Sequence, residues 1–119
     1  MAILDELRDA ATQAISAGAN AVRGQGTALR SDFETFIGPQ LEGVLIHIAD
    51  ISDDFAAGNI GAEQAADGLR TQLNRVQIVV LAAAELALLA VQIIINAVLD
   101  AIRAVVNAAT TRAGGIALL

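Results

Sequence analysis

Few residues in this chain could do chemistry, and their spacing does not form a known catalytic or metal-binding arrangement. His47 is the only histidine, and there is no cysteine. A di-iron site in a helical bundle needs a glutamate three residues before its histidine, but Val44 occupies that position. Asp50, three residues after His47, could form a hydrogen bond with it. We therefore expect His47 to flank the apolar seam of its helix.

Closely spaced carboxylates are the other candidates for chemistry. Asp53 and Asp54 are adjacent, but an EF-hand needs oxygen ligands at alternating positions around a central glycine, which this stretch lacks. Glu85 and Asp100 would lie about 22 Å apart on one continuous helix, too far for a catalytic carboxylate pair. We expect Asp100 to pair with Arg103, three residues later. The sequence thus predicts no enzyme, no cofactor and no metal site.

Composition indicates one helical domain. The chain has 119 residues, of which 55% are hydrophobic and only 3% aromatic. The hydrophobic fraction is above that of an ordinary globular protein, and much of the difference is alanine, the best helix former. Because the chain has no cysteine, its sequence does not indicate whether it belongs to an oxidising or a reducing compartment. The N-terminal stretch lacks the basic region and uninterrupted apolar run of a signal peptide, so we expect none. The localisation is otherwise unassigned.

Charge is concentrated in the middle of the chain. Residues 31–69 contain eight acidic residues and no basic one: Asp32, Glu34, Glu42, Asp50, Asp53, Asp54, Glu63 and Asp67. Such a segment repels phosphate backbones, so we expect no nucleic-acid partner. It either forms a solvated helix face or meets a basic partner surface.

Two helices are predicted in the first half, at residues 2–23 and 32–57. The first has an apolar stripe that begins with large residues and ends with small ones: Leu4, Leu7, Ala11, Ala14, Gly18 and Ala21. Ile15 and Val22 widen this stripe. The second has a heptad seam: Ile37, Leu41, Val44, Ile48, Ile51 and Phe55. Ser31 and Glu34 fit a capping box, Gly38-Pro39 predicts a kink or a restart, and Gly58 is a natural helix stop.

The remaining segment reads as one very long helix over residues 62–113. Gly61 suits its N-cap, and no strong helix breaker occurs before Gly114-Gly115, because Gly68 is only a weak one. Unbroken, such a helix has about 50 residues and is about 75 Å long. The two shorter helices cannot cover it along its whole length. It must therefore kink, enter a membrane or be covered by other copies.

From residue 83 onward this segment sorts its side chains into distinct faces. One narrow stripe is polar, at helical spacing: Glu85, Gln92, Asn96, Asp100, Arg103 and Asn107. The opposite face is nearly all alanine and is the predicted helix-packing interface: Ala83, Ala87, Ala90, Ile94, Ala97, Ala101 and Ala104. Large apolar side chains fill both flanks, beginning just before this stretch with Leu81 on one flank and Ile78 on the other. Three of the four faces therefore need burial, which predicts partner helices or further copies of the chain.

The expected fold class is all-α, an antiparallel helical bundle or hairpin dominated by one very long C-terminal helix in a single domain, 1–119. We expect a non-enzymatic, self-associating structural subunit of a larger assembly, such as a virion or a similar complex. The alternative is a membrane-inserting or pore-lining protein with residues 78–99 in the bilayer. Glu85 and the missing interfacial Trp and Tyr oppose that alternative.

Overall fold

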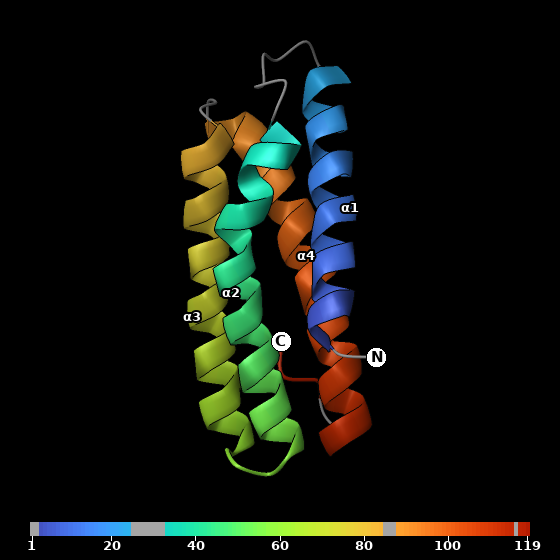
Figure 1. Cartoon of the computed structure of the whole chain (residues 1–119), viewed down its shortest axis with the longest axis vertical. Coiled ribbons are helices and arrows are strands. Elements are labelled where there is room, and N and C mark those ends of the chain that lie inside the picture. The colour runs from blue at the N-terminus through green and yellow to red at the C-terminus, as the bar shows by residue number, and fades with distance from the viewer. Residues whose placement is uncertain (1–2, 25–32, 85–87, 116) are drawn as a thin grey trace.

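The computed structural model shows four antiparallel helices connected in sequence (Figure 1). It describes residues 3–24, 33–84, 88–115 and 117–119, and for residues 84, 88–90, 113 and 114 it describes only the helical backbone. The helices are α1 (Ile3–Gly24), α2 (Phe33–Ala56), α3 (Ala62–Ala84) and α4 (Leu88–Gly114). The described part of the chain contains no strand, which confirms the all-α class.

The prediction of one very long C-terminal helix is wrong. The segment predicted as a single helix is divided into α3, which ends at Ala84, and α4, which begins at Leu88, and the two pack against each other. The longest dimension of the molecule is 47 Å, well short of the length of the expected helix. The chain therefore folds back on itself near the end of α3 (Figure 1).

Burial explains this break, because the local sequence carries no Gly or Pro signal for it. A continuous helix would leave most of its apolar surface in water, at about 25 cal/mol per Å². Folding back places Val76 and Val80 of α3 and Val91, Ile94 and Val98 of α4 in one shared core. The apolar faces that predicted partner copies are thus covered largely by the chain's own helices.

Helix pairing is uneven around the bundle. α1 and α4 share the most extensive contact, followed by α2 and α3, whereas α1–α2 and α3–α4 are less extensive. Across the diagonal, α2 touches α4, but the described residues of α1 and α3 do not meet. The bundle is therefore flattened, with α2 and α4 closing its middle.

The closest helix contact lies between α1 and α4. A Cβ atom built on Gly18 would lie 3.1 Å from the Cα atom of Ile94. This confirms that the small residues late in the first helix allow a neighbouring backbone to approach. The predicted stripe of α1 is buried at Leu7, Ala11 and Gly18, and the predicted flanking residues Ile15 and Val22 are buried with it. Leu4 and Ala14 are only half-buried and Ala21 is exposed, whereas Ala19, which was not predicted, is buried.

The turn between α2 and α3 follows the predicted glycine signals. Gly58 has a φ of 79°, a left-handed conformation that glycine adopts without strain. Its N–H donates to the carbonyl of Phe55 (3.1 Å) and that of Asn59 to Asp54 (2.9 Å), which is the Schellman pattern of a helix end. The carbonyl of Gly61 accepts from Ala65 (3.0 Å), as expected of the residue that starts α3.

The seam of α2 is confirmed from Ile37 to Ile48, begins one turn earlier than predicted, and is only half-buried at its last two members, Ile51 and Phe55. Phe33, Ile37, Leu41 and Ile48 are all buried. α2 is assigned as one helix through Pro39, so the chain does not restart there. Gly38 helps, because a residue without Cβ reduces the clash between a proline ring and the residue before it. Ser31, half of the predicted capping box, lies outside the described residues.

Candidate functional site

The predicted polar stripe lies on the outer face of α4 over most of its length. Gln92, Asn96, Asp100 and Arg103 are exposed. The Gln92 amide nitrogen donates to Asn96 Oδ1 (2.8 Å), and an Arg103 nitrogen lies 3.6 Å from an Asp100 carboxylate oxygen. The expected Asp100–Arg103 ion pair is thus present. Glu85, the first residue of the stripe, lies outside the described part of the chain.

Asn107, the last residue of the stripe, binds the C-terminal tail instead of water alone. Its Oδ1 accepts from the N–H of Leu119 (2.8 Å), and its Nδ2 donates to the carbonyl of the same residue (3.3 Å). Gly115, with a φ of 76°, ends α4 and lets the chain turn back. Leu118 is thereby buried against the core. The side-chain amide therefore binds both backbone polar groups of Leu119.

The predicted alanine face of α4 is covered within the chain at one end and exposed at the other. Ala83, predicted as part of this face, lies on α3 and is buried there, and on α4 Ile94 is buried, Ala97 and Ala101 are half-buried and Ala104 is exposed. Ile94 packs against Gly18 of α1. Ala87 and Ala90 fall outside the residues whose side chains are described. The close helix approach expected of this face thus occurs between α4 and α1 of one chain.

Large apolar side chains are exposed near the C-terminal end of α3. Ile78 keeps 66% of its surface exposed and Leu81 keeps 45%, and Ala82 beside them is also exposed. We call these three residues the α3 patch. Sequence periodicity placed Ile78 and Leu81 on flanks that need burial and so missed them as surface. The folding back of α4 leaves them outside, because its own stripe covers the other side of α3.

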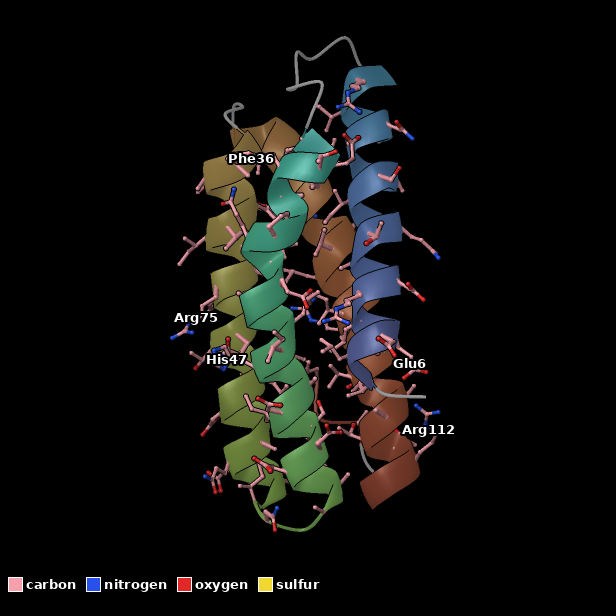
Figure 2. The ribbon with its side chains drawn as sticks, viewed as in Figure 1. Glu6, Phe36, His47, Arg75 and Arg112 are labelled. Atoms are coloured by element: carbon pink, nitrogen blue, oxygen red, sulfur yellow. The ribbon has the colours of Figure 1, made fainter. Side chains whose placement is uncertain are left out.

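Ion pairs join different helices at the bundle surface. Arg8 of α1 pairs with Glu42 of α2, Arg23 of α1 with Glu34 of α2 (2.6 Å), and Arg112 of α4 with Glu6 of α1 (3.7 Å). Figure 2 shows Glu6 and Arg112 together beside the start of α1. The acidic residues of the segment 31–69 therefore do not all act alike, because two of them, Glu34 and Glu42, form ion pairs between α2 and α1.

The Arg23–Glu34 pair makes stability depend on pH. A hydrogen bond from Arg23 holds the pKa of Glu34 below its ordinary value of 4.5. The pair therefore stabilises the fold at a pH above 4.5, and its contribution is lost as the pH falls through the lowered pKa of Glu34.

We expect Glu34→Gln to lower the urea midpoint at neutral pH and to have no effect at an acidic pH below the lowered pKa of Glu34. Glu63→Gln, at the exposed start of α3, is the matched control, and an equal loss there would contradict the assignment.

His47 is not part of a metal-binding group of side chains among the described residues. It is exposed on α2, as are Asp50, Asp53 and Asp54, and the described residues contain no group of three side chains suited to a metal ion. In Figure 2 its side chain lies outside the core on the α2–α3 side. The expected position beside the buried Val44 and Ile48 is confirmed.

Gln72 is the one side chain in the described core whose polar atom is buried without a hydrogen bond. It lies between Leu69 and Val76 in the buried stripe of α3, and its Oε1 atom has no hydrogen-bond partner. Burying an unpaired carbonyl costs about 1–3 kcal/mol. Gln72 therefore lowers the stability of the fold at a position where the apolar residues around it raise it.

Among the described helices, α4 alone has the length and composition to cross a membrane, over Val91–Arg112. A core helix of a soluble bundle meets the same criteria, and Val91, Ile94 and Val98 are buried here. The 78–99 window proposed from sequence does not form one helix, because residues 78–84 belong to α3 and residues 88–99 to α4.

Comparison with models of known families, with curated proteins and with solved structures finds no match to this chain.

Proposed function

We propose that the chain is a non-enzymatic structural module that self-associates within a larger assembly and that the α3 patch is its contact surface. The observation that carries this proposal is the exposure of Ile78 and Leu81 one turn apart on the same helix. Contiguous exposed apolar surface is typical of interaction sites. The non-enzymatic part continues to rest on the sequence, with its single histidine and no cysteine.

A second copy of the chain fits this surface on electrostatic grounds. The stretch 76–84 contains no charged residue, whereas the whole chain carries a net charge of −6. Two copies that meet at the acidic parts of the surface bring like charges together, whereas at the α3 patch they bring apolar side chains together. The apolar surface left for a partner is smaller than the sequence suggested, because α1, α2 and α3 already pack against α4 and bury most of its large apolar side chains.

Replacing Ile78 with lysine is expected to convert the oligomer to a monomer. The charge would have to be buried without a partner, which opposes association without disturbing a side chain that is already exposed. Light scattering of the full chain at micromolar concentration measures this. Ile46→Lys is the matched control, because Ile46 is an isoleucine on α2 with 38% of its surface exposed. That variant should remain oligomeric.

A wild-type chain that is monomeric at micromolar concentration would contradict the proposed self-association.

The runner-up function is membrane association through α4, which requires the bundle to open because the apolar side chains of α4 face the core. Flotation with lipid vesicles tests it. Protein that stays with the lipid after high-salt and carbonate washing favours the membrane function, and protein left in solution favours the soluble assembly.

A further inference from the structure

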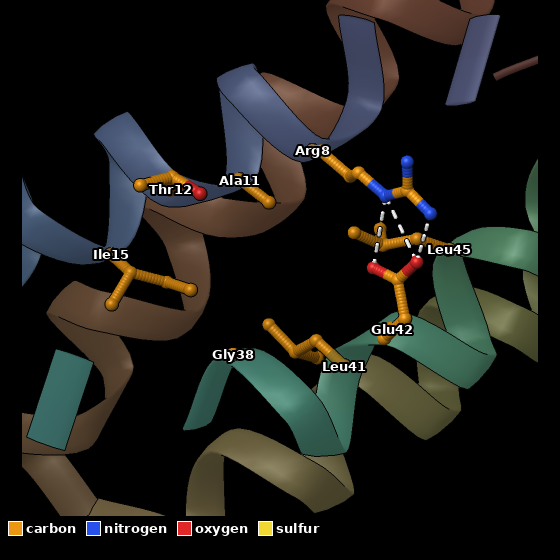
Figure 3. Close-up of a pocket in the computed structure, with 8 residues that line it drawn as sticks. All are labelled: Arg8, Ala11, Thr12, Ile15, Gly38, Leu41, Glu42 and Leu45. Atoms are coloured by element: carbon orange, nitrogen blue, oxygen red, sulfur yellow. Dashed lines mark hydrogen bonds and ion pairs between the residues drawn. The ribbon is translucent and has the colours of Figure 1, made fainter. Parts of the chain in front are cut away.

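A cavity of about 220 Å³ lies between α1 and α2 (Figure 3). Its floor consists of Ala11 and Ile15 of α1 and Leu41 and Leu45 of α2, all of which are buried. Thr12 and Gly38 lie at its exposed rim. The cavity therefore extends from the surface to the apolar core layer.

Small residues on facing helices leave this space open. Ala11 faces the cavity from α1 with only a methyl group, and nothing lies within 4 Å of a Cβ atom built on Gly38 of α2. Elsewhere small residues bring helices together, as Gly18 does at Ile94. Here the contact between α1 and α2 is less extensive than that between α1 and α4, so the space is not closed.

One end of the cavity is polar, and its groups are charged. Arg8 donates from Nε to both carboxylate oxygens of Glu42, at 2.9 and 3.1 Å, and from Nη2 to one of them. Its Nη1 lies 3.4 Å from an oxygen of Asp5. One guanidinium thus meets two carboxylates. An anionic ligand would meet a net negative charge, whereas a neutral hydroxyl can donate to Glu42 or accept from Arg8.

We propose that the α1–α2 cavity binds a small uncharged apolar molecule, of the size of a benzene ring with a short substituent, whose hydroxyl group points toward Arg8 and Glu42. The volume is suitable, because an apolar cavity of about 150 Å³ in another protein binds benzene. The floor supplies apolar contact on both helices, and the polar end supplies orientation. This inference does not depend on self-association.

Benzyl alcohol and benzoate are the probes, because they share a ring and differ in charge. Benzyl alcohol should shift the methyl resonances of Ile15, Leu41 and Leu45 saturably at millimolar concentration and raise the thermal midpoint, since binding to the native state stabilises it. Benzoate should bind more weakly. Absence of saturable shifts, shifts confined to other methyl groups, or tighter binding of benzoate would each overturn the proposal.

Filling the cavity is the second measurement. Ala11→Leu should abolish the benzyl alcohol shifts and raise the thermal midpoint, because its side chain occupies the empty space. Ala10→Leu is the matched control, since Ala10 is the half-buried neighbour that does not line the cavity, and it should retain the shifts. A lower midpoint or failure to fold in Ala11→Leu would show that the site is already filled and would overturn the proposal.

Discussion

Replacing Gly18 with leucine is expected to lower the free energy of unfolding by about 3 kcal/mol. The added side chain would meet the backbone of Ile94, because even a Cβ atom at Gly18 would lie 3.1 Å from the Cα atom of that residue. A flexible side chain could move aside, but a helix backbone moves only if α4 shifts as a whole. Urea unfolding followed by circular dichroism measures the change.

Gly43 provides the comparison for this substitution. It is an exposed glycine inside α2, and nothing lies within 4 Å of a Cβ atom built there. Gly43→Leu should raise stability by up to about 1 kcal/mol, because leucine is the better helix former. If both variants changed stability alike, the close approach of α1 to α4 would not be a constraint on the fold.

Truncating Phe33 to alanine is expected to cost about 3–5 kcal/mol, the range for removing a buried aromatic ring. Phe33 is the largest of the side chains with less than 2% of their surface exposed, and it starts the buried seam of α2. Since a bundle of this size has a total stability of about 5–15 kcal/mol, the variant should be only marginally folded. The urea midpoint and its slope report the loss.

Phe36→Ala tests whether the loss depends on burial. Phe36 lies three residues later in the same helix, but 38% of its surface is exposed. Its truncation should cost clearly less than that of Phe33. Equal losses would mean that the first turn of α2, rather than the core contact of Phe33, determines the effect.

The helix ends that glycine marks were the most predictable part of this fold. Glycine marks them by backbone chemistry that acts within a few residues, and Gly58, Gly61 and Gly115 all lie at the ends expected of them. The seam of α2 was predictable because it is also a local pattern. Ile37, Leu41 and Ile48 lie at heptad spacing, which indicates a buried face whichever helix packs against it.

The break between α3 and α4 was not predictable from local signals. Residues 76–84 are strong helix formers or apolar, and neither glycine nor proline follows Ala84 before Leu88. The decision depends on burial across the whole chain, which outweighs helix propensity. The same limit applies to the surfaces. Periodicity placed Ile78 among residues that need covering, and only the path of α4 shows that it stays exposed.

Asn107 shows a further limit of spacing. It continues the polar stripe at the correct interval, yet its amide binds Leu119 twelve residues away. A polar residue at a helix surface has many possible partners, and the sequence does not rank them. The Asp100–Arg103 pair was predictable because both partners lie on one helix, where geometry sets the distance.

The pairing of α1 with α4 also sets the order in which this bundle can form. α2 and α3 are neighbours in the chain and can close early as a hairpin, but the most extensive contact joins the first helix to the last. During synthesis the face of α1 that packs against α4 stays uncovered until α4 emerges, because the α1–α2 contact covers only another part of α1. A chain arrested before α4 keeps that face open to chaperones or to the α4 of a neighbouring chain, which makes helix exchange between copies its natural misfolding route.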